Sequence, residues 1–280
     1  MGRDVLTAVD HLIIRVSDPI QAVETYRNLG FMMTHGPGVA YAALGDVYFE
    51  LRGRNGPPPG FWDDSSWSEP DEGIYGVVLR SAGLDEDLAR LRSSGVRVSD
   101  PVDDPIDGVG GSLARSSAAV DAPIPLRLVE HHHHTEDRLS FLGGSVTHAN
   151  TATTLERIYV AVESIERELE IFERVLGMPA PEPEMGTVII SLMSVFYIGS
   201  IGIAVAEPRG PGPTGEALSA RGPGFFQMLF RAKHLDEAER VMVGNGVPAP
   251  TRGTRLSGES ALLVEPAQAC GVYVALAGRP

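Results

Sequence analysis

Two short segments near the start of the chain carry residues that could do chemistry together. Residues 9–16 read Val-Asp-His-Leu-Ile-Ile-Arg-Val, and residues 47–51 read Val-Tyr-Phe-Glu-Leu. In an extended strand, side chains alternate between the two faces, so His11, Ile13 and Arg15 should share one face and Leu12, Ile14 and Val16 the other. An imidazole or a carboxylate such as that of Glu50, facing a pocket, can bind a metal ion or act as a general base.

An amphipathic helix is expected directly after the first segment. Asp18 is a predicted N-cap, Pro19 suits the first helical position, and Gly30 is the predicted stop. The inward stripe of this helix should be Ala22, Tyr26 and Leu29. The segment that carries His11 is therefore predicted to be a strand with one face covered by a helix.

This order of elements, a strand, a helix and three strands, recurs along the chain. The first unit continues with short strands up to residue 51, and the second begins at residues 74–80 and continues with a helix over residues 83–94. The third and fourth units begin at residues 155–162 and 224–231, with helices over 164–176 and 235–243. The sequence therefore predicts an α+β fold of four βαβββ modules.

The modules group two and two along the chain. The predicted domains are an N-terminal domain (1–135, modules 1–58 and 72–130), a linker (136–152) and a C-terminal domain (153–280, modules 153–208 and 222–280). The pairing of the modules stays open, because the first could face the second or the fourth. That choice decides whether Arg127 or Gln227 completes the pocket around His11.

Composition narrows the class of protein. The chain has 280 residues, 43% of them hydrophobic, which is enough for one large core or two ordinary ones. A net charge of −14 without a Lys/Arg cluster argues against nucleic acid and anionic membranes as partners. No visible signal peptide or long apolar run, and a single cysteine, Cys270, predict a cytoplasmic protein. We expect a small-molecule partner, and the exposed sheet edges of such a fold suit a homodimer.

The repeat pattern and the two motifs together resemble the vicinal oxygen chelate superfamily. The opening Val-Asp-His, then Asp-Pro, then Tyr-Arg-Asn-Leu-Gly-Phe, and the later Val-Tyr-Phe-Glu-Leu, are similar to its glyoxalase-like branch. The superfamily includes glyoxalase I, extradiol dioxygenases, methylmalonyl-CoA epimerase and bleomycin-binding proteins. The resemblance implies two glyoxalase-like domains, each with paired βαβββ modules around a pocket and helices outside.

The same resemblance implies a metal site of which this sequence retains half. His11 and Glu50 match the positions of ligands to one divalent ion, such as Zn, Mn, Ni, Mg or Fe. The matching positions in the other three modules are Gly76 and Arg127, Arg157 and Ala204, and Gln227 and Ala275. A metal centre would need further donors, and a metal-free pocket stays an alternative. The nearest candidates for these donors are His35, Tyr75, Glu130, His131 and Gln227.

We expect a small-molecule enzyme that works through an enolate or oxyanion in the N-terminal pocket, with isomerase, lyase or cyclase chemistry. His11 would ligate a metal ion or move a proton, Glu50 would be co-ligand or base, and Arg80 and Arg127 would hold substrate charge. One alternative is a metal-free binding protein of the bleomycin-resistance type. A second is an extradiol dioxygenase, which needs a complete site of two His and one carboxylate that the motifs do not assemble. The C-terminal half is expected to be scaffold or interface.

Several other side chains are predicted to contact the substrate or a charged partner. The predicted substrate-binding residues are Arg15, His35, Tyr48, Trp62, Trp67, Tyr75 and Gln227. An arginine on a pocket wall needs an acid, supplied either by the protein or by an anionic ligand. For Arg157 we expect an acid on a strand or at an interface. Consecutive side chains at 131–134, all histidines, should point to alternate sides, so this run is interpreted as a solvated linker rather than a ligand cluster.

Overall fold

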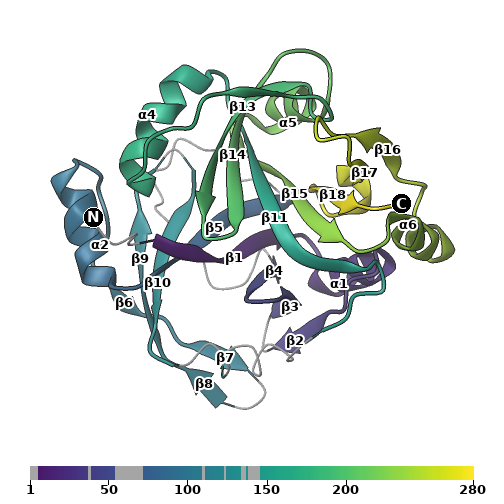
Figure 1. Cartoon of the computed structure of the whole chain (residues 1–280). Helices are drawn as coiled ribbons and strands as arrows, with labels where there is room; N and C mark the ends of the chain where they lie inside the picture. Colours follow the sequence, from purple (N-terminus) through teal and green to yellow (C-terminus); the bar gives the residue numbers. More distant parts are fainter. Residues whose placement is uncertain are drawn as a thin grey trace.

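Most strands of the protein belong to two curled sheets with helices around the outside (Figure 1). The computed structural model describes residues 6–36, 39–53, 72–108, 111–122, 124–133, 137 and 146–280. Trp62, Trp67 and His134 lie outside the described residues. The predicted α+β class with two similar halves is confirmed.

The first sheet has eight strands, all from the first half of the chain. Their order is β2 (Thr34–Gly36), β3 (Val39–Leu44), β4 (Val47–Gly53), β1 (Leu6–Val16), β5 (Gly73–Ser81), β10 (Leu126–His131), β9 (Arg115–Val120) and β6 (Val102–Asp103). A separate hairpin is formed by β7 (Ile106–Gly108) and β8 (Gly111–Leu113). Since β1 pairs antiparallel with β5, the first module joins the second and not the fourth.

The second sheet repeats this order in the second half. Its strands are β12 (Glu184–Gly186), β13 (Ser191–Ile198), β14 (Ile201–Pro208), β11 (Ala152–Ala161), β15 (Gly224–Ala232), β18 (Tyr273–Gly278), β17 (Ser260–Val264) and β16 (Thr251–Thr254). The helices are α1 (Pro19–Asn28), α2 (Leu84–Ser93), α4 (Ile165–Leu176), α5 (Pro213–Arg221) and α6 (Leu235–Gly244), with a short 3₁₀ turn, η1 (Pro266–Gln268). Helix α5 was not predicted, because it begins inside a Gly/Pro-rich stretch; Pro213 fits its first turn, where the missing N–H is not needed.

Helix α1 forms as its sequence predicts. The side chain of Asp18 accepts hydrogen bonds from the backbone N–H groups of Ile20 and Gln21, which have no partner within the helix. Gly30 follows the helix with φ of +86°, a conformation that glycine adopts without strain. The helix therefore begins at the predicted cap and ends just before the predicted glycine stop.

Each sheet has two chemically different faces. Leu12, Ile14 and Val16 of β1 pack into the large shared core. On the opposite face, Ile13 packs with Val78 and Val129 in a smaller cluster. We call this second face, which also carries His11, the inner face of the first sheet. The corresponding inner face of the second sheet carries an apolar cluster that includes Tyr159, Ala204 and Ala275.

The two halves share one core. The rings of Phe31 and Phe49, from the first half, lie 5.2 and 6.1 Å from the ring of Phe230 in β15. The predicted linker ends in buried residues, since His148 accepts a hydrogen bond from the backbone N–H of Met32 and Asn150 donates one to a backbone carbonyl of the first half. These contacts predict that the two halves unfold together.

None of the described helices is long and apolar enough to cross a membrane.

Phe230→Ala tests the shared core. Phe230 is fully buried between the halves, so removing its ring should lower the free energy of unfolding by about 3–5 kcal/mol. Urea unfolding, followed by circular dichroism and tryptophan fluorescence, should show one transition in both probes. Phe230→Leu, which keeps most of the apolar volume, should cost less. Two separated transitions in the wild type would contradict a shared core.

Candidate active site on the first sheet

A β-bulge in β1 brings two adjacent polar residues to the inner face. Val9 pairs with Leu79 and His11 with Val78, so Asp10 is an extra residue opposite the neighbouring strand. Bulges re-aim side chains in this way and are common beside active sites. Asp10 therefore bonds to inner-face groups although regular alternation would place it with Leu12.

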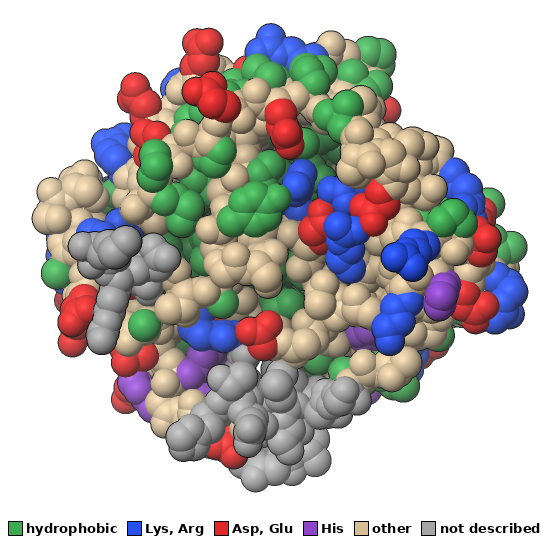
Figure 2. Space-filling model, viewed as in Figure 1, with side chains coloured by type: hydrophobic (Ala, Val, Ile, Leu, Met, Phe, Trp, Pro, Cys, Tyr) green, Lys and Arg blue, Asp and Glu red, His purple; other side chains and the backbone are tan. Residues whose placement is uncertain are grey.

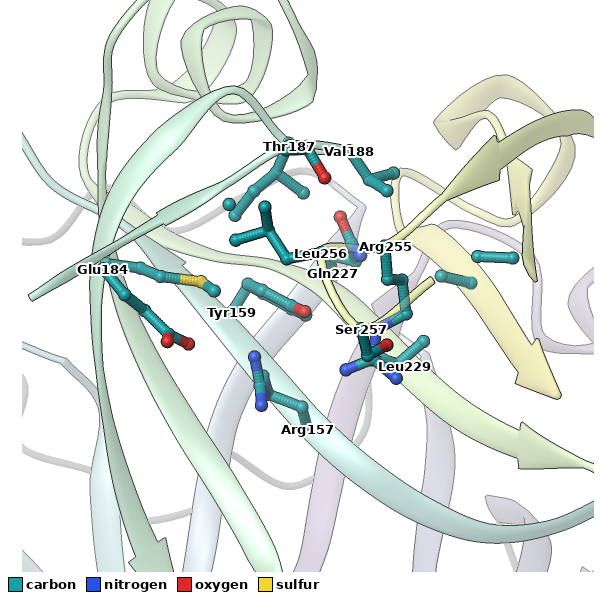
Figure 3. Close-up of a pocket in the computed structure, with 15 residues that line it drawn as sticks. Arg157, Tyr159, Glu184, Thr187, Val188, Gln227, Leu229, Arg255, Leu256 and Ser257 are labelled. Atoms are coloured by element: carbon teal, nitrogen blue, oxygen red, sulfur yellow. The ribbon is translucent and has the colours of Figure 1, made fainter. Parts of the chain in front are cut away.

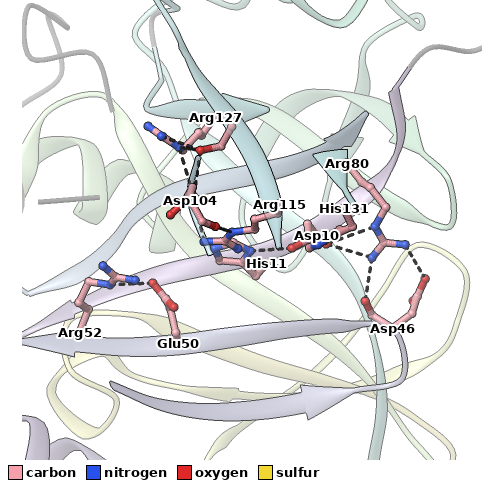
Figure 4. A network of polar contacts seen from close by, with 11 residues as sticks. Asp10, His11, Asp46, Glu50, Arg52, Arg80, Asp104, Arg115, Arg127 and His131 are labelled. Carbon is pink, nitrogen blue, oxygen red and sulfur yellow. Dashed lines mark hydrogen bonds and ion pairs between the residues drawn. The ribbon is translucent and has the colours of Figure 1, made fainter. Parts of the chain in front are cut away.

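Asp10 is a fully buried carboxylate surrounded by donors (Figure 4). One oxygen lies 2.9 Å from Nδ1 of His11, and the other lies 2.7 Å from Nε2 of His131. Arg80 donates to this second oxygen from Nε and Nη2, each at 3.2 Å. A carboxylate accepts and does not donate, so Nδ1 of His11 carries the proton and its Nε2 keeps the lone pair.

The imidazole of His11 is held as a neutral group. Its side chain is 2% exposed and stacks on the ring of Tyr48, with ring centres 4.6 Å apart. Burial lowers the pKa of His11, and the hydrogen bond to Asp10 and the nearby Glu50 offset this only in part. Among contacts of the described residues, none occupies Nε2. The arrangement can therefore supply a general base or a metal ligand at Nε2.

Arg115 is a second buried charge at this face. It donates from Nε to the backbone oxygen of Asp104 at 2.6 Å and pairs through Nη2 with the Asp104 carboxylate at 3.0 Å. Its Nη1 is buried and has no hydrogen-bond partner among the described residues. Figure 4 shows Arg115 next to His11, and its charge contributes to lowering the pKa of His11. Arg115 can thus stabilise negative charge that develops beside His11.

The Asp104 carboxylate lies between two arginines, Arg115 and Arg127, and pairs with both. Arg127 donates to the Ser117 hydroxyl at 2.9 Å and lies 3.8 Å from the Asp104 carboxylate. Burial would raise the pKa of Asp104, but Arg115, the Ser117 hydroxyl and Arg127 together lower it. Asp104 is therefore an ionised partner that supports the two arginines.

Glu50 lies on the same face as His11. Strands β1 and β4 are parallel, with His11 opposite Tyr48 and Ile13 opposite Glu50, so the two functional side chains are one pleat apart. Glu50 is 3% exposed, and one of its oxygens accepts a hydrogen bond from Arg52 at 2.8 Å. His11 and Glu50 thus lie on the same inner face, as predicted, and Glu50 already pairs with Arg52.

The residues present fit only half of a metal centre. His11 and Glu50 would be two donors, but no third His, Cys, Asp or Glu joins them among the residues that the structure describes. At the positions where the resemblance places the other two ligands, the second module has Gly76 and Arg127. A guanidinium repels a cation, so the described residues favour a site that works through its own side chains.

Other predicted site residues lie apart from His11. Arg15 stacks over the ring of Tyr75, with its guanidinium carbon 4.3 Å from the ring centre, at the opposite end of β1. His35 accepts a hydrogen bond from Arg27 beside helix α1. Gln227 belongs to the second sheet. Glu130, considered above as a metal donor, instead accepts a hydrogen bond from the backbone N–H of Leu84 at the start of α2.

The histidine run is partly built into the sheet. His131 ends β10 and contacts Asp10, so the interpretation of a solvated linker is wrong for this residue. The predicted alternation is confirmed for the described histidines, because the rings of His131 and His133 lie 4.9 Å apart whereas His132 lies by the Ser116 hydroxyl. His131 has the same parity as Arg127 along β10, and that sequence signal could have identified it.

Acidification tests the burial of His11. Folding lowers the pKa of His11, so below pH 6.5 the unfolded chain binds a proton at this residue more readily than the folded chain does. The free energy of unfolding should therefore decrease as the pH is lowered below 6.5. His11→Gln should remove this contribution, about 1.4 kcal/mol at most between pH 7.5 and 5.5. Urea unfolding at both pH values, with EDTA present, measures it. His234→Gln, which removes an exposed imidazole, is the control for the loss of one histidine. The same slope in His11→Gln as in wild type would contradict this prediction.

Comparison with known proteins places this geometry in a family. A triple variant of 4-hydroxymandelate synthase from Streptomyces coelicolor superposes with a TM-score of 0.65, at 15% identity, covering 98% of this chain and 93% of that one. A fusion of a xylose isomerase-like TIM barrel with a 4-hydroxyphenylpyruvate dioxygenase gives 0.65 at 13% identity, and this chain, 99% covered, spans 49% of it. A hypothetical protein from Staphylococcus aureus gives 0.63 at 9% identity, covering 96% of this chain and 98% of that one.

These three structures establish the fold and not the reaction, because their sequence identities are low. No curated protein sequence matches the chain significantly. The family model of the glyoxalase-like domain matches residues 9–176, which is more than half of the chain. The chain therefore belongs to the glyoxalase-like domain family.

Proposed function

We propose that the inner face of the first sheet is a proton-transfer site for a small carbonyl compound, and that the chain is an isomerase or lyase acting through an enolate. The observation that carries this proposal is the buried pair of Asp10 and His11, in which the carboxylate fixes a neutral imidazole with its lone pair on Nε2. A neutral, oriented imidazole is a suitable general base near neutral pH.

In this mechanism, Nε2 of His11 takes a proton from the carbon next to the substrate carbonyl. The electron pair of the broken C–H bond moves into the C–C bond, and the carbonyl oxygen becomes the enolate oxygen. Asp10, which accepts the hydrogen bond from Nδ1, stabilises the imidazolium that forms. Return of the proton to another position gives an isomerisation, and expulsion of a group from the next carbon gives a lyase reaction.

Arg115 is the cation that we assign to the enolate oxygen. It lies close to His11 and holds a buried Nη1 for which the described residues provide no acceptor. A fixed, buried guanidinium stabilises a developing negative charge more strongly than water does.

The predicted role of Arg80 and Arg127, holding substrate charge, changes in this proposal. Arg80 pairs with Asp10, and Arg127 lies against Ser117 and Asp104. We therefore assign both arginines to positioning: Arg80 holds the carboxylate that orients His11, and Arg127 supports the acid that holds Arg115.

A second candidate function is a metal-free protein that binds a small molecule without converting it. The engagement of Glu50 by Arg52 favours this candidate, since it removes one of the two acids that could assist His11. Oxygen insertion of the extradiol type is not favoured, because its two His and one carboxylate must point at one metal ion. Here His11 and His131 bond to the carboxylate of Asp10 itself, and no three of the described residues are arranged to hold a metal ion.

Proton exchange into deuterated water tests the proposal directly. The protein is incubated in D₂O with a panel of small 2-oxo acids and acyl thioesters, and loss of the signal of the proton next to the carbonyl is followed by NMR. His11→Ala should slow this exchange by about 10²–10⁴-fold, since it removes the base. Asp10→Asn should also slow it, because the imidazole loses the acceptor that fixes its tautomer.

His234→Ala is the matched control, because it removes an exposed imidazole far from the sheet's inner face and should leave exchange unchanged. Circular dichroism should confirm that every variant is folded. Exchange that persists at the wild-type rate in His11→Ala would refute the assignment. Binding of the panel compounds without any exchange would favour the second candidate function.

Metal content is a separate prediction. With only His11 and Glu50 as donors, protein purified without a nickel column should contain well below one equivalent of divalent metal per chain. Proton exchange by the protein should also persist after dialysis against EDTA. Mass spectrometry of the metals measures this in the wild type, in His11→Ala and in a variant with residues 131–134 replaced. About one equivalent, lost in His11→Ala and retained in the other variant, would instead establish a metal centre at His11.

A further inference from the structure

A cavity of about 250 Å³ opens on the inner face of the second sheet, in the half of the chain that was expected to be scaffold (Figure 3). Arg157 and Tyr159 enter it from β11, and Gln227 and Leu229 enter it from β15. The segment after β16 forms another wall. Concave, mostly apolar pockets with a few convergent polar groups are the usual form of small-molecule sites.

The position of Arg157 corresponds to that of His11. In the first sheet His11 pairs with Val78 after a bulge, and in the second Arg157 pairs with Leu229 after a bulge at the same place. By the same register, Gln227 corresponds to Gly76. The two halves thus use one backbone arrangement to present different chemistry.

Arg157 has no acid partner. Its side chain is 8% exposed, its Nη2 donates to the Tyr197 hydroxyl at 3.1 Å, and its buried Nε has no partner among the described residues. No carboxylate lies within ion-pair distance of it in the part of the chain that the structure describes, so the expected salt bridge is absent there. Burying an unpaired charge costs several kcal/mol, which indicates that an anion completes the site.

The neighbouring charges do not supply that anion. Glu156 pairs with Arg255 at 2.6 Å and with Arg231 at 2.7 Å, and Glu259 pairs with the same two arginines. Two acids therefore balance two arginines, and Arg157 remains as an uncompensated positive charge. Figure 2 shows basic and acidic side chains side by side on this side of the molecule.

The residues around Arg157 are smaller than their counterparts around His11, and one of them, Ala275, lines the cavity. Tyr48, which covers His11 in the first sheet, corresponds to Gly202 in the second. A Cβ atom on Gly202 would lie 2.7 Å from the Val195 side chain, so Val195 packs against this glycine where the first sheet has the ring of Tyr48. The counterparts of Glu50 and Arg127 are the alanines Ala204 and Ala275.

Gln227 adds a second unmet polar group. It is 2% exposed, and its buried Oε1 accepts no hydrogen bond from the described residues. A carbonyl oxygen of this kind requires a donor. The remaining walls include Tyr159, Met193 and Leu229, which suit an apolar body, and the acid that lines the cavity, Glu184, is exposed at its edge.

We propose that the second sheet binds a small organic carboxylate without a metal ion. Arg157 holds the carboxylate, Oε1 of Gln227 accepts a hydrogen bond from a hydroxyl or N–H of the ligand, and an aryl or branched alkyl group fills the apolar part of the cavity. This site is independent of the proton-transfer site on the first sheet, so either proposal can fail alone.

Phenyllactate is a suitable probe because it combines a carboxylate, a hydroxyl and an aromatic ring. Isothermal titration calorimetry should show binding of phenyllactate in the millimolar range or tighter. The primary amide of phenyllactate lacks the charge and should bind at least tenfold more weakly, which is about 1.4 kcal/mol. 3-Phenylpropanoate lacks the hydroxyl and should also bind more weakly, because Gln227 then has no donor.

Arg157→Met and Gln227→Leu test the two polar anchors. Arg157→Met should reduce phenyllactate binding at least tenfold and should raise the melting temperature of the ligand-free protein, because it removes an unpaired buried charge. Gln227→Leu should reduce the preference for phenyllactate over 3-phenylpropanoate, and it keeps the test decisive if Arg157→Met does not fold. Arg240→Met, which removes an exposed arginine paired with Glu237, is the matched control and should change neither quantity.

Four results would overturn the proposal. The first is that phenyllactate does not bind to the wild type, and the second is that phenyllactate and its amide bind equally. The third is that a folded Arg157→Met protein binds phenyllactate as the wild type does. The fourth is that His11→Ala loses phenyllactate binding whereas Arg157→Met retains it. The last result would place the probe on the first sheet.

Discussion

A carboxylate withdrawn completely from water needs donors on every side, and Asp10 meets this requirement with two imidazoles and a guanidinium from three other positions of the first sheet. Because the donors come from β1, β5 and β10, the same bonds that satisfy Asp10 also fix the strands relative to one another. The orientation of His11 is a consequence of this packing. The hydrogen bonds to Asp10 thus both orient His11 for proton transfer and join the strands of the first sheet.

The bulge that exposes Asp10 to the inner face recurs in the second sheet with Glu156 at the equivalent position. There the acid pairs with Arg231 and Arg255, and the next residue, Arg157, is left without an acid. In the first sheet the corresponding residue, His11, is covered by Tyr48, whereas in the second the cover is reduced to Gly202. One fold therefore gives a closed network of charges in one half and an open cavity in the other.

The fold could be predicted from the sequence because its signals are local. Alternation in β1, the cap at Asp18 and the stop at Gly30 are set by neighbouring residues. The glycine stop recurs after α2, α4 and α6, whereas among the described helices only α1 is capped by the side chain of its own N-cap residue. The contact between Asp10 and His131 joins residues that are 121 positions apart, and no local pattern specifies it. Periodicity also assigns Asp10 to the wrong face, since it cannot anticipate a bulge.

Charge pairing was the least predictable part of the site for the same reason. An arginine on an inner face requires compensation, but sequence alone does not say whether an acid or a ligand provides it. Arg80 pairs with Asp10, whereas Arg157, in the other sheet, donates a hydrogen bond to the Tyr197 hydroxyl and has no acid partner among the described residues. A cationic side chain at a position where the resemblance implies a metal ligand changes what the pocket can select, because it attracts an anionic group directly, without a metal ion between protein and ligand. In the proposed carboxylate site, Arg157 would provide this attraction on the same backbone arrangement that presents His11 in the first sheet.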